Sequence, residues 1–244
     1  MCVFDVLRPT AAPNTISIDP THSIHIGNMD LRCVTMMRPR NKMLVTSLEG
    51  NLVLFDTITF SQVQSQFFSN VSQCRGSAWS AYSSTFAIAQ QHRICGYDAR
   101  NNRFCYSIPF EDVREIRSVS AEDSYRVTFT TGSGCLVFGD VRMQKVLPLE
   151  GIQNSSPTAT IGASVPNSLP MQMRTGQRLV KNGSAYQLIG GHVTRNDFYT
   201  QNFAPWPVEH ALFTHCYDPS GMRIFVGGGP SLAHLEGCNS AIIF

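Results

Sequence analysis

Two arginines at matching positions are the residues of this sequence best suited to bind a charged ligand. Arg32 stands in Leu31-Arg32-Cys33-Val34 and Arg117 in Ile116-Arg117-Ser118-Val119, each just before a β-prone run. A guanidinium pairs with a carboxylate in a planar, two-pronged geometry, and such charge-assisted bonds are strong. If equivalent positions of a repeat face one centre, both side chains line an anion pocket near the mouth of a central channel. A solvated charge or an ion pair between neighbouring repeats remains the alternative.

Two Asp-x-Arg triplets are the next candidates, Asp98-Ala99-Arg100 and Asp140-Val141-Arg142. An aspartate that follows a strand commonly accepts hydrogen bonds from the backbone of the next turn. We therefore predict that Asp98 and Asp140 cap turns within their own repeats.

No group of residues indicates catalysis, a metal or a cofactor. The seven histidines are scattered, and no spacing among them and the cysteines makes a ligand set. Gly227-Gly228-Gly229-Pro230 lacks the Lys-Ser/Thr of a phosphate loop, so we interpret it as a close-packed turn. His215 is predicted to be a buried structural residue. The sequence favours a binding protein over an enzyme, with no cofactor.

Composition narrows the class of protein further. The chain has 244 residues, 43% of them hydrophobic and 15% charged, which is ordinary for a domain with a real core. No run approaches the roughly 18 apolar residues of a membrane helix, and the first 13 residues do not resemble a signal peptide. Eight cysteines spread singly suit a reducing compartment, so a cytoplasmic and nuclear location is expected. The net charge of +2 argues against direct binding of nucleic acid.

The strands that position these candidate residues can be predicted from a repeat whose units each end in aspartate. Asp56, Asp98 and Asp140 each follow an apolar run, and 98 minus 56 and 140 minus 98 both give 42. A period of about 40–45 residues is that of a four-stranded propeller blade. Short β-prone runs separated by turn signals fill each repeat, and no long amphipathic helix is indicated. We predict an all-β, WD40-type β-propeller of about four blades that are part of a larger propeller.

Two parts of the chain depart from this period. Residues 148–204 are expected to be a flexible insertion, because Gly151 to Arg174 is rich in Ser, Pro, Gly and Asn. Order should resume with a hairpin around Asp218-Pro219-Ser220-Gly221. Val3-Phe4-Asp5 repeats the strand ending 51 residues before Asp56, so we expect it to belong to a blade begun before Met1. A truncated longer chain is the preferred explanation.

Three stretches carry a more specific resemblance. The hairpin sequence Phe213-Thr214-His215-Cys216-Tyr217-Asp218, followed by Phe225-Val226-Gly227-Gly228-Gly229-Pro230, resembles the closing blade of the cullin-4-associated factor twelve family. Ile116-Arg117-Ser118-Val119-Ser120 and Leu136-Val137-Phe138-Gly139-Asp140-Val141-Arg142 are similar to two further segments of that family. The resemblance runs from Met1 to Phe244 and corresponds to about the C-terminal half of the family's chain.

The resemblance implies a substrate receptor of a cullin-4 RING ubiquitin ligase. Such a propeller binds the damaged-DNA-binding protein 1 adaptor and presents substrates with acidic C-termini, typically two glutamates. It would assign Arg32 and Arg117 to the acidic tail. Asp140 with Arg142 would be the favoured contact with the adaptor, and Asp98 with Arg100 the second candidate. Asp30, where the family has a lysine, would repel a carboxylate. The alternatives are a WD40 scaffold with no link to ubiquitin, or an inactive truncated product.

Overall fold

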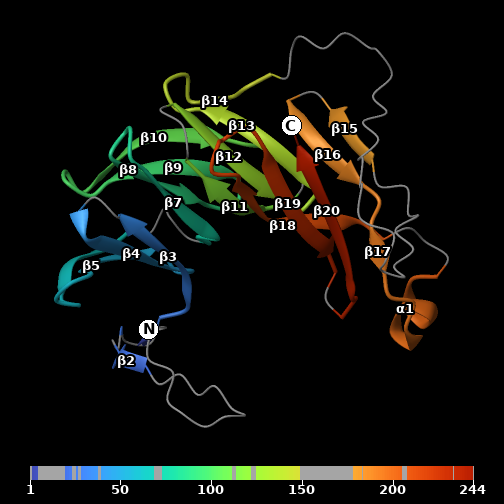
Figure 1. Cartoon of the computed structure of the whole chain (residues 1–244), viewed down its shortest axis with the longest axis horizontal. Helices are drawn as coiled ribbons and strands as arrows, with labels where there is room; N and C mark the ends of the chain where they lie inside the picture. Colours follow the sequence, from blue (N-terminus) through green and yellow to red (C-terminus); the bar gives the residue numbers. More distant parts are fainter. Residues whose placement is uncertain are drawn as a thin grey trace.

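The structure is a computed structural model in which nearly all regular structure is β. It describes residues 2–4, 20–23, 26, 29–37, 40–68, 73–111, 114–121, 125–148, 178–182, 184–204, 208–232 and 234–243. Four sheets of these residues follow one another in chain order as the blades of a β-propeller (Figure 1). The predicted fold class and the count of four blades are confirmed.

The first two blades have the regular order of four consecutive antiparallel strands. Blade 1 consists of β3 (Leu31–Met37), β4 (Lys42–Ser47), β5 (Asn51–Asp56) and β6 (Gln62–Phe67). Blade 2 consists of β7 (Gly76–Ser80), β8 (Thr85–Ala89), β9 (Arg93–Asp98) and β10 (Arg103–Pro109). The predicted leading strand is β1 (Cys2–Phe4), which pairs with β2 (Pro20–Ser23) in a separate two-stranded sheet. Asp5 lies outside the described residues.

Blades 3 and 4 keep the three inner strands and vary the outer one. Blade 3 has β11 (Ile116–Ser120), β12 (Arg126–Thr131), β13 (Cys135–Asp140), β14 (Lys145–Val146), β15 (Arg178–Asn182) and β16 (Ala185–Ile189). The outer edge of β13 is divided, because β16 pairs with its first half and β14 with its last two residues. Blade 4 has β18 (His210–Tyr217), β19 (Ile224–Pro230), β20 (Gly237–Ile243) and, on the outer edge of β20, β17 (His192–Val193).

The stretch expected to be an insertion contains regular structure from Arg178 onward. Residues 178–193 form β15, β16 and β17, and the short helix α1 (Asp197–Asn202) follows. The chain crosses from blade 3 to blade 4 at Gly190 and Gly191. Gly190 has a φ of 87°, and a Cβ on Gly191 would lie 2.5 Å from Nε2 of His210. Glycine therefore suits this crossing sterically. The strands on either side of it, β16 and β17, pair with β13 of blade 3 and β20 of blade 4, so the crossing links the outer edges of the two blades. Residues 151–174 lie outside the described part.

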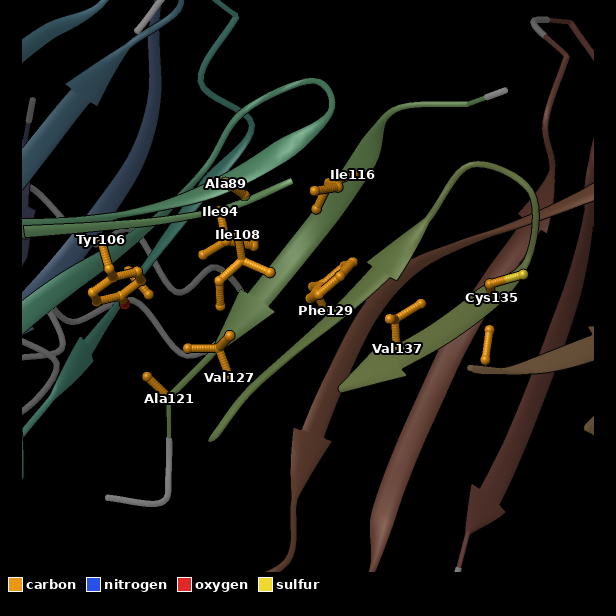
Figure 2. Packing of buried hydrophobic residues seen from close by; sticks show 12 residues of the cluster. Ala89, Ile94, Tyr106, Ile108, Ile116, Ala121, Val127, Phe129, Cys135 and Val137 are labelled. Carbon is orange, nitrogen blue, oxygen red and sulfur yellow. The ribbon is translucent and has the colours of Figure 1, made fainter. Parts of the chain in front are cut away.

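The hydrophobic core lies between blades. One cluster joins blades 1 and 2, a second joins blades 2 and 3, and a third joins blades 3 and 4. Figure 2 shows the second cluster, in which Ile94 and Ile108 of blade 2 face Val127 and Phe129 of blade 3. All four side chains are at most 1% exposed. Since burial of such a side chain stabilises by about 1.5–3 kcal/mol, each blade depends on its neighbour for stability.

The first strands of the blades pack side by side and interlock by one repeated contact. Ser77 of β7 lies against Cys33 and Thr35 of β3: Thr35 Oγ1 donates to the Ser77 carbonyl at 2.9 Å, and the two hydroxyls are 2.5 Å apart. His215 of β18 lies between Ser118 and Ser120 of β11, with ring nitrogens 2.7 and 2.8 Å from the two hydroxyl oxygens. In both junctions one residue of the later blade contacts two alternate residues of the earlier blade.

The middle junction repeats this contact without polar atoms. Val119 of β11 occupies the place of Ser77 and His215, and it packs close to Gly76 of β7. Val119 and Ala78 are both half-buried against the core cluster of blades 2 and 3. The junctions thus share a geometry while their chemistry changes from hydroxyl to valine to imidazole.

The triple glycine of blade 4 is a strand, so the predicted turn at residues 227–230 is wrong. Gly228 pairs with Leu212 of β18 and with Asn239 of β20. A Cβ at this position would lie only 1.8 Å from the carbonyl oxygen of Ala211. Glycine is needed here because the neighbouring backbone comes close, a second role of strand glycines that the turn interpretation overlooked.

His215 gives the junction of blades 3 and 4 a pH dependence. Burial lowers the pKa of His215 to about 4 in the folded chain, whereas an unfolded histidine titrates near 6.5. The unfolded state therefore binds more protons between pH 6.5 and 4, and stability falls as the pH falls through this range. In His215→Gln we expect a lower urea midpoint at pH 7.5 and a weaker decline between pH 7.5 and 4.5. His192→Gln, at an exposed position, is the control. Parallel declines in both variants would refute this role.

Candidate functional site

The candidate residues lie at opposite ends of the blades. Arg32 and Arg117 are at the starts of β3 and β11, and Asp98 and Asp140 are at the ends of β9 and β13. The first and third strands of a blade run in the same direction, because each is antiparallel to the strand between them. The start of one and the end of the other therefore face opposite ends of the sheet. The site consists of an arginine end and an aspartate end.

At the arginine end, the repeat equivalence of Arg32 and Arg117 is confirmed. Each is the extra residue of a β-bulge, because the register shifts between Leu31 and Cys33 and between Ile116 and Ser118. Bulges turn a side chain out of the regular alternation of the sheet. Arg75 has the same place in blade 2, where its backbone N–H donates to the Ala89 carbonyl just before β7.

Arg75 and Arg117 share one carboxylate. Nη2 of Arg75 is 2.6 Å from Oε2 of Glu115, and Nη2 of Arg117 is 2.9 Å from Oε1. The guanidinium of Arg117 also lies 5.9 Å from the ring centroid of Phe213, the bulge residue of blade 4. The Nε atoms of both arginines are buried and have no hydrogen-bond partner among the described residues. The two guanidinium groups thus converge on one carboxylate, and each keeps an N–H that can donate a further hydrogen bond.

Arg32 lies in blade 1, next to the blade of Arg75, and has an ion pair of its own. Its Nη2 is 3.0 Å from Oδ2 of Asp30, and both side chains are well exposed. The structure therefore does not bring Arg32 and Arg117 into one ion pair; each is held by an acidic residue two positions before it. Asp30 neutralises the arginine that was expected to receive a ligand carboxylate.

Sequence reasoning missed three residues of the arginine end: Arg75, Arg114 and Glu115. Arg114 forms an ion pair with Glu209, which directly precedes β18. This ion pair connects blades 3 and 4. A signal for Arg75 was present, since 117 minus 75 gives 42, the period of the aspartates. Glu115 could be recognised only in space, because it links arginines of two different blades.

At the aspartate end, the predicted turn caps are confirmed. Asp98 Oδ1 accepts from the backbone N–H of Arg100 at 2.9 Å, and Asp140 Oδ1 accepts from those of Arg142 and Met143 at 2.7 and 3.1 Å. Asp56 makes the equivalent bonds with Ile58 and Thr59. Hydrogen bonds from Arg100 and Arg142 hold the pKa values of Asp98 and Asp140 below the usual range.

The arginines of the two triplets fold back on their own aspartates. Nε and Nη2 of Arg100 donate to the two carboxylate oxygens of Asp98 at 2.9 and 2.8 Å. Nη2 of Arg142 is 3.2 Å from Oδ2 of Asp140, and its guanidinium lies 4.1 Å from the ring centroid of Tyr125. The side chains are nevertheless 51% and 62% exposed. Each arginine therefore presents one fixed, accessible face.

Neither a metal centre nor a membrane span is found in the described part of the chain. Among those residues, no group of three or more His, Cys, Asp or Glu side chains could hold a metal ion. No helix in the same part is long and apolar enough to cross a membrane.

The chain matches one protein family and is similar to solved structures of β-propellers. Residues 3–243 match the model of a family described as DDB1- and CUL4-associated factor 12 beta propeller. Among solved structures, the chain is similar to the WD40 repeats of RRP9, with 8% identity and a TM-score of 0.45 over 50% of this chain and 39% of that one. It is also similar to the Cps50 (Swd1) β-propeller domain of Myceliophteria thermophila, with 12% identity and a TM-score of 0.49. That match covers 85% of this chain and 51% of the other, so this chain spans 39% and 51% of the lengths of the two structures.

The caps at the aspartate end should contribute to stability. In Asp98→Asn we expect a loss of about 1–2 kcal/mol at pH 7, because the clamp on Arg100 loses its charge. A lowered folded pKa adds stability above the usual pKa near 4, and this gain is lost as the pH falls through the folded value. The unfolding midpoint of Asp98→Asn should therefore vary less than wild type below pH 4. Glu111→Gln, at an exposed position, is the control, and equal acid sensitivity of the Asp98 variant and wild type would contradict this account.

Proposed function

Because the chain belongs to the DDB1- and CUL4-associated factor 12 β-propeller family, we propose that it acts as a substrate receptor of a cullin-4 RING ubiquitin ligase. In this proposal the arginine end binds acidic C-terminal tails of substrates, and the aspartate end contacts the damaged-DNA-binding protein 1 adaptor. It acts as a binding protein with no reaction of its own. The observation that carries the proposal is the convergence of Arg75 and Arg117 on the carboxylate of Glu115.

Glu115 supports the choice of ligand because its carboxylate has the geometry that a ligand carboxylate would need. Each of its two oxygens contacts a different guanidinium, and the two arginines come from different blades. A tail ending in two glutamates presents three carboxylates within a few ångströms, which suits several guanidinium donors at once. Phe213 beside Arg117 adds an apolar surface for the tail's methylene groups.

The separation of the two ends supports the choice of adaptor residues. A receptor must bind substrate and adaptor at the same time, and the sheets place Arg142 and Arg100 at the end opposite Arg117. Arg142 is the stronger candidate of the two. Its guanidinium is stacked on Tyr125 and 62% exposed, so little side-chain freedom is lost when a partner binds it.

Peptide binding tests the arginine end. A peptide ending in two glutamates should bind the chain. The matched peptide, which ends in two glutamines and has an amidated C-terminus, should bind at least tenfold more weakly. Arg117→Ala and Arg75→Ala should each weaken binding of the first peptide about tenfold, as expected for loss of a charge-assisted pair. Arg32→Ala should have a smaller effect, because Asp30 already holds that side chain. Isothermal titration calorimetry at two salt concentrations measures the affinities.

Arg103→Ala is the matched control, since Arg103 is exposed and begins an outer strand. Equal affinity for the two peptides would refute the acidic-tail proposal and favour a scaffold without this specificity.

Adaptor binding tests the aspartate end. We expect Arg142→Ala to weaken binding of purified damaged-DNA-binding protein 1 more than Arg100→Ala, and both variants to keep their affinity for the diglutamate peptide. Biolayer interferometry with the immobilised adaptor gives the comparison. If wild type binds and both variants bind equally well, the adaptor does not use this end. The opposite pattern, with adaptor binding lost in Arg117→Ala, would exchange the roles of the two ends.

A further inference from the structure

A groove lies between blades 3 and 4, at the end of the sheets away from the arginine cluster. It has a volume of about 330 Å³. The rings of Phe138, Tyr186 and Tyr217 line it, together with the side chains of Met222, Ile243 and Arg126. Met222 is 76% exposed at its rim, in the hairpin between β18 and β19. The lining residues come from both blades, so the groove depends on how the two sheets pack.

The groove is larger than the pocket at the corresponding place between blades 1 and 2. Lys42 and Leu54 of blade 1 occupy the repeat positions of Arg126 and Phe138, and they line a much smaller pocket of about 80 Å³ between blades 1 and 2. There β6 continues along β5, and its Val63 and Gln64 line the pocket.

In blade 3 the corresponding outer strand consists of two pieces. β16 pairs with β13 as far as Val137, and β14 pairs with Gly139 and Asp140. Between the two pieces the backbone N–H of Leu147 donates to the Phe138 carbonyl at 2.8 Å, and Leu147, Phe138 and Tyr186 line the groove where the pieces meet.

The rings around the groove are already fixed in place. Phe138 and Tyr186 meet edge to face, with centroids 6.3 Å apart and planes at 87°. The hydroxyl groups of Tyr217 and Thr128 form a hydrogen bond across the junction of blades 3 and 4, with their oxygens 2.5 Å apart. Ile224 is 7% exposed and belongs to the same cluster, so it forms a firm base. A ligand would enter a preformed surface and would lose little affinity to ordering the protein.

The chemistry of the lining indicates a protein partner. Tyr, Phe, Met and Arg are the residues enriched in the centres of protein interfaces, and acidic residues and lysine are depleted there. Arg126 is the charged residue among the described residues that line the groove. The volume is at the small end of the range for ligand pockets, enough for one large side chain and its neighbour. The positive charge at one side complements a carboxylate next to that side chain.

We propose that this groove binds an extended segment of a partner protein through a large aromatic side chain followed by an acidic residue. The aromatic side chain lies among Phe138, Tyr186 and Met222, and the carboxylate pairs with Arg126. The site lies at the other end of the blades from Arg75 and Arg117. It therefore adds a second peptide-binding site that does not depend on the proposed receptor function.

The test uses the full chain and acetylated, amidated eight-residue peptides of Gly and Ser with one central pair. Blocked termini remove the C-terminal carboxylate, so the arginine cluster offers no competing tail site. In a ¹H–¹⁵N NMR titration we expect the Phe-Asp peptide to bind with a Kd on the order of 1 mM, as for a contact of two residues. The Ala-Asp peptide should bind at least tenfold more weakly, and the Phe-Lys peptide several-fold more weakly.

Two variants separate the parts of the site. Met222→Asp should reduce binding of the Phe-Asp peptide at least tenfold. Arg126→Ala should remove the preference for Phe-Asp over Phe-Lys and keep the preference for Phe over Ala. Met143→Asp and Arg103→Ala are matched controls, because Met143 is 61% exposed outside the groove and Arg103 begins β10 as Arg126 begins β12.

Unchanged binding in Met222→Asp would overturn the proposal, as would equal binding of the Phe-Asp and Ala-Asp peptides. Sedimentation velocity identifies a different occupant. If the chain dimerises with increasing concentration and Met222→Asp abolishes the dimer, the groove binds a second copy of the chain and the peptide assignment is wrong.

Discussion

Burial of apolar side chains between neighbouring blades is the interaction on which the rest of this structure depends. A four-stranded sheet has two faces, and the strands of this chain carry large apolar residues on both, such as Leu44 and Val45 of β4. The next blade covers the face of Leu44, and Ile26 and Met29 from the segment before β3 pack on the face of Val45. The contacts of Ser77, Val119 and His215 then fix how far one first strand lies along the next. Core and register are therefore set at the same junctions.

The positions of the functional groups follow from these junctions. The bulge at the start of β11 brings Arg117 out of the regular alternation, Arg75 has the equivalent place before β7, and junction packing brings both to one carboxylate. At the other end, Asp98 and Asp140 close turns and fix the arginines beside them. The groove between blades 3 and 4 lies where the two pieces of the outer strand of blade 3, β14 and β16, meet along β13. The charged sites and the groove are thus products of the same repeat and of its local irregularities.

The sequence revealed the inner strands well and the outer strands poorly. The inner strands are apolar and end in aspartates 42 residues apart, and that signal survives without any knowledge of packing. β6 reads Gln-Val-Gln-Ser-Gln-Phe and is mostly exposed, so neither apolarity nor a turn signal separates it from a loop. β16 was missed because it pairs with β13, about 50 residues earlier in the chain. At the site, repetition disclosed Arg32 and Arg117, whereas Glu115 acquires its role only through contacts between blades.

The divided edge of β13 also bears on how a protein of this family can change over evolutionary time. Both β14 and the hairpin of β15 and β16 belong to the sheet of that strand, so the strands before and after residues 149–177 lie in the same blade. The entropic cost of closing a flexible loop between two fixed strands grows only with the logarithm of the loop's length. Insertions and deletions between residues 148 and 178 should therefore leave the register of the sheets unchanged. This segment is where descendants of a common ancestor can acquire new sequence most freely.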